Sequence, residues 1–207
     1  RHGAFVVGAE LFDNARFGVS PAESAAMDPQ QRLVLEGGYA ALHNASFDRA
    51  QLLGSGTGVN VGIYSTEFAQ ILSHGPQAHS VYAATGASLS IASGRTSFVL
   101  GLHGPCAAFE TACSAALVAF HSAARAVQRC ECAAHLAVGV NVMLLQASSV
   151  GMAIAGMTSE RGRCHTFDSR ADGFARGEGL SVVVGGWAEA GEGWMQSRGS
   201  AVRQDGR

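Results

Sequence analysis

The chain has 207 residues, of which 47% are hydrophobic and 14% are charged, enough for one compact domain with a buried core. The net charge is −2 and charges of both signs are interspersed, so the sequence predicts neither a nucleic-acid partner nor an anionic membrane partner. All 14 basic residues are arginine, which excludes mechanisms that need a Schiff-base lysine, a Walker A lysine or a serine–lysine pair.

The five cysteines are an odd number, and no charged-then-apolar leader precedes them. We therefore expect a reducing, cytoplasmic compartment. No apolar stretch approaches the roughly 20 residues of a membrane-spanning helix. The sequence opens at Arg1 without a methionine and stops at Arg207 without an obvious domain end, so we expect a fragment of a longer protein.

Two helices are predicted near the beginning of the chain. Ser20 and Asp28 each stand before a proline, and Glu23 and Gln31 follow three residues after them, as in helix-capping sequences. The pair Gly37-Gly38 falls inside the second helix, where each glycine costs about 1 kcal/mol relative to alanine. The sequence alone offers no reason for that pair.

Strand-like and helix-like segments then alternate, without a repeat or linker that would divide the chain. The strand-like segments are 57–64, 136–142 and 180–187, and the helix-like segments are 88–100 and 114–127. On the helix 114–127 one face carries Leu117, Phe120, Ala124 and Val127. The segment 180–187 is almost uniformly apolar, which is typical of a strand covered on both faces. This alternation predicts a layered α/β fold.

Cys113 falls where a short strand runs into the helix 114–127. Unpaired backbone N–H groups and the helix dipole favour a thiolate at such a position, and the small neighbours Ala112 and Ser114 leave room for a substrate. A small buried cysteine would suit the same pattern. The local residues therefore leave a nucleophile and a structural cysteine equally open.

The segment 111–117, T-A-C-S-A-A-L, resembles the nucleophile motif D-T-A-C-S-S-S-L of the β-ketoacyl synthases, particularly the ketosynthase domains of polyketide synthases. Glu110 stands in place of the family's aspartate, and Ala115-Ala116 in place of two serines; both changes are mild. Four further blocks resemble those of the family in the same order: 26–33 (A-M-D-P-Q-Q-R-L), 94–105, 162–179 and 198–206.

The resemblance implies a thiolase-like α/β fold with a layered αβαβα architecture, of which the chain would hold most of the first of two similar halves. Residues 1–207 would then be a partial ketosynthase domain that lacks the first strand and the whole C-terminal half. That missing half would carry two catalytic histidines and a glycine-rich loop. The implied partners are an acyl carrier protein, a second copy paired through the strand 106–110, and other polyketide synthase domains.

The implied reaction uses Cys113 as the catalytic nucleophile. An acyl group arrives as a thioester on the phosphopantetheine arm of the carrier protein and is transferred to Cys113. A malonyl-type extender then loses carbon dioxide, and its enolate attacks the acyl group in a decarboxylative Claisen condensation. The resemblance implies no cofactor or metal bound by this chain itself.

Other interpretations stay open at this point. The chain could be a fatty-acid ketosynthase, a thiolase, or a non-catalytic docking or dimerisation module of the same fold. The blocks Met27 to Gln31 and Ala171 to Gly173 favour the polyketide type over a thiolase, and the presence of Cys113 argues against a non-catalytic module.

Several other features are better explained by structure than by chemistry. His103, His121 and His165 match no catalytic motif of the family. The segment 130–132, C-E-C, lacks a second pair of metal ligands and indicates a surface turn. The glycine-rich segment 54–58 leads into a strand instead of a helix, which argues against a phosphate-binding loop.

Overall fold

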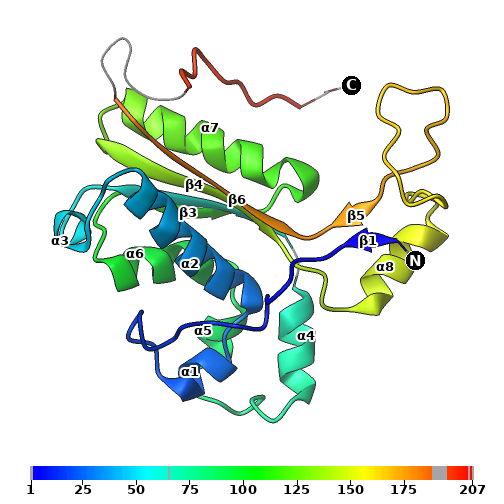
Figure 1. Ribbon diagram of the computed structural model, residues 1–207, viewed down its shortest axis with the longest axis horizontal. Coiled ribbons are helices and arrows are strands. Elements are labelled where there is room, and N and C mark those ends of the chain that lie inside the picture. The colour runs from blue at the N-terminus through cyan, green and yellow to red at the C-terminus, as the bar shows by residue number, and fades with distance from the viewer. Residues whose placement is uncertain (1, 65, 188–194, 205, 207) are drawn as a thin grey trace.

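The computed structural model describes residues 2–64, 66–187, 195–204 and 206; Arg1, Asp205 and Arg207, used in the predictions above, lie outside these residues. Helices and strands alternate along most of the chain (Figure 1). In chain order the elements are β1 (Gly3–Ala4), α1 (Pro21–Ala25), α2 (Pro29–Asn44), α3 (Arg49–Leu52), β2 (Gly58–Ile63), α4 (Glu67–His74), α5 (Ala83–Ala87), α6 (Ile91–Leu100), β3 (Cys106–Phe109), the 3₁₀ turn η1 (Ala112–Ser114), α7 (Ala115–Gln128), β4 (Ala134–Asn141), α8 (Gln146–Ile154), β5 (Arg176–Gly177) and β6 (Gly179–Gly186).

A four-stranded sheet in the order β3-β2-β4-β6 forms the middle layer. Strands β3, β2 and β4 are parallel, and β6 is antiparallel to β4. Helix α7 packs on one face of this sheet, while α2 and α6 pack on the other (Figure 1). The short strands β1 and β5 form a separate parallel pair. The layered α/β fold predicted from the sequence is confirmed.

Strand β2 is buried at all six of its positions, so the strand predicted at 57–64 lies inside the sheet with both faces covered. Its bulky residues Val59, Val61 and Ile63 belong to the main hydrophobic core, together with residues of α2 and α6. The alternate residues Gly58, Asn60 and Gly62 therefore face α7, since side chains alternate between the faces of a strand.

Helix α7 lies unusually close to the sheet because both surfaces carry small residues. A Cβ atom added at Gly62 would overlap the backbone of Ala115 and Ala116, and one added at Gly139 would lie 2.6 Å from Cβ of Ala116. The face with Leu117, Phe120, Ala124 and Val127 packs only in part, because Val127 is buried whereas Leu117 is 73% exposed. The buried side of the helix consists of Ala115, Ala119, Ala123, Ala126 and Val127.

The glycine pair Gly37-Gly38 inside α2 is also explained by close packing of a helix on the sheet, here on the face opposite α7. A Cβ atom at Gly37 would overlap the side chain of Leu180 in β6, and one at Gly38 would lie 2.9 Å from Cδ2 of Leu136 in β4. Close packing therefore compensates for the low helix propensity of glycine at these two positions.

The two predicted helix caps are present. The Ser20 side chain accepts a hydrogen bond from Glu23 N, and the Asp28 side chain accepts one from Gln30 N. The Glu23 and Gln31 side chains, however, do not bond back to the caps. They join a buried polar network instead. The predicted capping sequences therefore both begin two helices and connect them to the rest of the fold.

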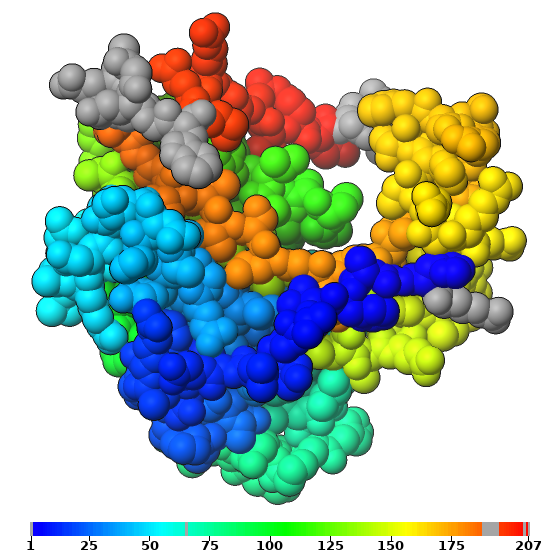
Figure 2. Space-filling model, in the orientation of Figure 1, coloured from blue at the N-terminus to red at the C-terminus, as the bar shows by residue number. Residues whose placement is uncertain are grey.

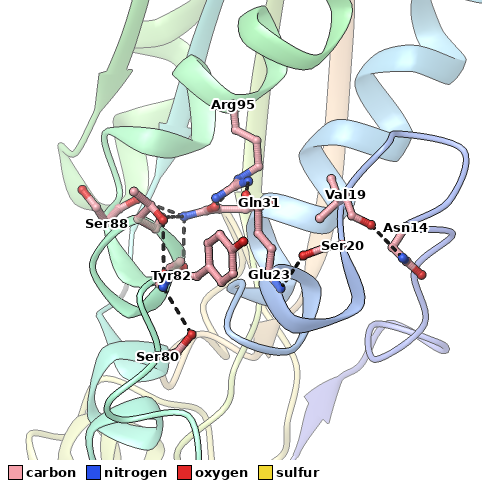
Figure 3. A network of polar contacts seen from close by, with 11 residues as sticks. Asn14, Val19, Ser20, Glu23, Gln31, Ser80, Tyr82, Ser88 and Arg95 are labelled. Carbon is pink, nitrogen blue, oxygen red and sulfur yellow. Dashed lines mark hydrogen bonds and ion pairs between the residues drawn. The ribbon is translucent and has the colours of Figure 1, made fainter.

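That network is built around Arg95 of α6 (Figure 3). The Arg95 guanidinium donates to Gln31 Oε1 at 2.9 Å and pairs with the Glu23 carboxylate. A Cβ atom at Gly86 would overlap the carbonyl oxygen of Ala26, so this glycine lets α5 approach. The two N–H groups of the Gln31 amide point among three carbonyl oxygens within hydrogen-bond distance, those of Thr85, Gly86 and Ser88.

Strand β6 lies at an edge of the sheet and is only partly covered. Ser181 and Val183 are exposed, whereas Leu180 and Val182 pack toward α2 and the main core. In these residues, then, the α7 side of this apolar strand is left partly uncovered, as the hypothesis of a partial domain expects for a strand meant to be covered on both faces. None of the helices among the described residues has the length and apolar character needed to cross a membrane.

We expect Gly62→Ala to destabilise the fold by about 1–3 kcal/mol, because the new methyl group would push α7 away from β2. Urea denaturation of the two proteins measures the difference. Gly94→Ala is the matched control, since a Cβ atom at this helical glycine meets no described atom within 4 Å apart from its chain neighbours and the backbone of its own helix. It should stabilise the fold by about 0.5–1 kcal/mol. Equal effects of the two substitutions would contradict the close contact of α7.

A second prediction concerns the buried cap Asp28. Burial raises the pKa of its carboxyl to about 6. Hydrogen bonds from Gln30 and the positive charge of Arg32 act in the opposite direction but are outweighed. The folded state thus binds the proton more tightly than the unfolded state, and the contribution of Asp28 to stability decreases as the pH rises from about 4 through 6. Asparagine keeps the cap without the charge.

The free energy of unfolding of Asp28→Asn, relative to that of the parent chain, should therefore increase by about 1 kcal/mol as the pH is raised from about 5 to about 8. Denaturation midpoints at both pH values test this. Asp48→Asn, at the exposed cap of α3, should show no such pH-dependent gain. If the stability difference between Asp28→Asn and the parent chain were the same at both pH values, Asp28 would not be a buried carboxylate that ionises in this range.

Candidate active site

Cys113 lies in the turn that joins β3 to α7. Strand β3 ends at Phe109, the 3₁₀ turn η1 spans Ala112–Ser114, and α7 begins at Ala115. Cys113 is exposed, and the preceding residue, Ala112, has a left-handed φ of +50°. A left-handed backbone is unfavourable for alanine, and such strain concentrates at functional sites.

The hydroxyl of Ser114 closes this turn. Ser114 Oγ lies 2.8 Å from both the carbonyl oxygen and the Oγ1 atom of Thr111, and Ser114 N donates to the same carbonyl oxygen at 3.2 Å. The residues on either side of Ala112 and Cys113 are thus tied together. These bonds hold the left-handed residue in place and fix the backbone that carries the sulfur.

The turn lies at the carboxyl edge of the parallel strands. Strands β2, β3 and β4 all end on this side, and open α/β sheets bind their ligands there. The loop after β4 is fixed at the same edge by side chains from three distant parts of the chain. The bonds run from Val142 N to Gln30 Oε1 (3.3 Å), from Met143 N to Glu178 Oε1 (2.9 Å), and from Leu144 N and Leu145 N to Glu67 Oε2 (2.6 Å each).

In the described part of the chain, no histidine makes a hydrogen bond to the Cys113 sulfur. His121 of α7 lies 2.8 Å from Ser200 Oγ through its Nδ1 atom. His135 is buried in β4, and burial lowers its pKa. No group of three acidic, histidine or cysteine side chains among the described residues could hold a metal ion.

Exposure alone does not distinguish Cys113 from the other cysteines. Cys106, Cys130 and Cys164 are also exposed, and only Cys132 is buried. The predicted turn at 130–132 is present, but its last residue points inward, and burial raises the pKa of the Cys132 thiol. What distinguishes Cys113 is its place in a strained turn at the carboxyl edge of the sheet.

The side of the molecule next to the start of α7 is open. In the space-filling view, a lobe formed by α8 and the segment that follows it (yellow) stands apart from α7 (green) with a gap between them (Figure 2). Apolar side chains of this lobe are exposed, among them Ile154 at 83% and Phe167 in full. The hypothesis of a partly uncovered layer agrees with this surface.

The chain matches the family model "Beta-ketoacyl synthase, N-terminal domain" over residues 1–184. It belongs to the β-ketoacyl synthase family. It is 42% identical over 210 aligned residues to a phenolphthiocerol/phthiocerol polyketide synthase of Mycobacterium tuberculosis, with 99% of this chain and 14% of that protein covered. It is also 42% identical to polyketide synthase GfsB of Streptomyces halstedii, with 100% of this chain and 4% of that protein covered.

Solved ketosynthase structures have the same fold. The ketosynthase from module 6 of the bacillaene synthase of Bacillus subtilis 168 superposes with a TM-score of 0.80 at 35% identity, covering 88% of this chain and 31% of that one. An oxazolomycin ketosynthase domain of Streptomyces albus JA3453 gives a TM-score of 0.80 at 32% identity, covering 88% and 32%. The predicted thiolase-like fold is confirmed, and this chain spans about a third of the solved ketosynthases.

We expect Ser114→Ala to slow the alkylation of Cys113 severalfold, because a hydrogen bond is worth about 1 kcal/mol and the turn loses two that hold it. The rate with iodoacetamide is measured by peptide mass spectrometry. Ser73→Ala is the control. It removes an exposed hydrogen bond from the Ser73 hydroxyl to the carbonyl oxygen of Gln70 in α4 and should leave the alkylation rate of Cys113 unchanged. An unchanged rate in Ser114→Ala would show that the hydroxyl does not position the sulfur.

Proposed function

We propose that this chain is the nucleophile-bearing part of a polyketide synthase ketosynthase domain and that Cys113 is its nucleophile. The observation that carries the proposal is the exposed cysteine in a strained, hydrogen-bonded turn at the carboxyl edge of a ketosynthase sheet. The 42% identity to polyketide synthases over almost the whole chain favours them as the class of parent enzyme over a fatty-acid ketosynthase.

In the proposed reaction, the Cys113 thiolate attacks the carbonyl carbon of an acyl thioester on the phosphopantetheine arm of a carrier protein. The carbon–sulfur bond to the arm breaks, the arm leaves as a thiol, and Cys113 holds the acyl group. A malonyl-type extender on a second carrier loses carbon dioxide, and its enolate carbon attacks the acyl carbonyl. The new carbon–carbon bond forms as the bond to Cys113 breaks, which regenerates the thiolate.

We further propose that residues 1–207 are a partial domain whose condensing site is completed by a second half. The family implies two catalytic histidines for the enolate step, and no described histidine here bonds to Cys113. The exposed apolar side chains of α8 and the lobe beyond it fit a surface that another part of the domain covers.

We also propose that two copies associate through β3. This strand lies at an edge of the sheet and, among the described strands, pairs only with β2, so its other side offers backbone N–H and C=O groups to a further strand. A two-fold axis between two such strands would pair them antiparallel. The carrier protein and the other synthase domains are the remaining proposed partners.

The nucleophile is tested in the complete domain by mass spectrometry after incubation with an acyl-carrier thioester. Cys113→Ala should abolish the acyl-enzyme without unfolding the domain, because the sulfur is lost from an exposed position and no core volume is removed. Cys164→Ala, which removes another exposed cysteine, should retain acylation. A normal amount of acyl-enzyme in Cys113→Ala would disprove the mechanism.

A further inference from the structure

Side chains hold the backbone of the loop 142–145, which joins β4 to α8 (Figure 1). Each of its four successive N–H groups donates a hydrogen bond to a side chain from a distant part of the sequence, over 2.6 to 3.3 Å. The acceptors are the amide oxygen of Gln30 and the carboxylates of Glu67 and Glu178, and one oxygen of Glu67 accepts two of the bonds. The conformation of this loop therefore depends on three side chains.

Two of the three acceptors are buried, since Gln30 is 1% exposed and Glu67 is 6% exposed. Gln30 and Glu178 are also held by further bonds. Gln30 Nε2 lies 3.4 Å from Asp28 Oδ2, and the second carboxylate oxygen of Glu178 accepts from Val6 N at 2.8 Å. Hydrogen bonds from N–H groups to a carboxylate are roughly twice as strong as neutral ones. The loop is therefore held in place by strong bonds to acceptors that have little freedom to move.

The loop 142–145 lies beside the turn that carries Cys113. Ala116, three residues after Cys113, packs so closely on Gly139 that a Cβ atom added at Gly139 would lie 2.6 Å from its own. Gly139 is three residues before the loop. The turn and the loop leave the same edge of the sheet, from strands that are two positions, or roughly 10 Å, apart. Residues 143–145 are apolar and half-buried, so the loop offers apolar side chains close to Cys113.

We propose that Gln30, Glu67 and Glu178 are positioning residues for acyl transfer, because they hold the loop 142–145 where a long acyl chain on its way to Cys113 packs against it. This inference rests on the proposed function. In the step concerned, the Cys113 sulfur bonds to the acyl carbonyl carbon as the bond from that carbon to the pantetheine sulfur breaks, and the proton of the Cys113 thiol ends on the departing sulfur. A long chain gains apolar contact with the loop, whereas an acetyl group is too short to do so. Loosening the loop should therefore slow the transfer of long chains selectively.

The test measures the single-turnover formation of acyl-Cys113 in the complete domain by mass spectrometry, with acetyl-pantetheine and octanoyl-pantetheine thioesters over a range of concentrations. Glu67→Ala should lower the second-order rate with the octanoyl thioester about tenfold and the rate with the acetyl thioester less than about twofold. The octanoyl loss should come from a higher half-saturation concentration, with the maximal rate retained. Glu67→Gln keeps an oxygen that can accept both N–H groups and should restore the octanoyl rate.

Glu178→Ala, at the half-buried acceptor, should show the same dependence on chain length and keeps the test valid if Glu67→Ala does not fold. Glu36→Ala is the matched control: this carboxylate also accepts a backbone N–H, that of Asp13 at 3.1 Å, but does not bond to the loop, so both rates should be unchanged. Equal losses with the two thioesters, or unchanged rates in both alanine variants at the loop, would overturn the inference and leave the proposed function in place. A parent domain that forms no acyl-Cys113 would disprove the proposed function, and the inference with it.

Discussion

The close contact between α7 and the sheet determines the position of the candidate nucleophile. Gly62 and Gly139 leave no side-chain layer between the strands and the start of the helix, and alanines cover the buried side of α7. The helix must therefore begin directly over the carboxyl ends of β2 and β4. The short turn from β3 then has little freedom, and Ala112 takes a left-handed conformation that presents Cys113 to solvent.

Several residues of the family-like blocks serve the framework in this chain. Asp28 and Gln31 begin and anchor α2, and Arg95 connects that helix to α6 and α1. Gln30 and Glu178 fix the loop after β4, close to the edge where Cys113 lies. In the proposed function the chemistry depends on one exposed sulfur, and a surrounding polar network keeps the edge of the sheet in one conformation.

Elements with local signals could be predicted from the sequence. The caps at Ser20 and Asp28 and the strand-to-helix step at Cys113 involve neighbouring residues and were correct. The packing face of α7 did not follow from its large apolar residues: Val127 is buried, but alanines, not Leu117, fit against the glycine-bearing strands. The support of the loop after β4 was missed because its bonds join residues 35 to 112 positions apart. The strain at Ala112 was also missed, since alanine carries no signal for a positive φ.

The central claim is that the contact of α7 with the sheet positions Cys113. The most direct measurement is the ratio of alkylation rates of Cys113 and Cys106 within one molecule, compared between the parent chain and Gly62→Ala. Cys106 lies at the opposite end of β3 from the turn and serves as the internal standard. The account predicts that the ratio falls when the helix is displaced. An unchanged ratio in a folded but destabilised Gly62→Ala protein would contradict it.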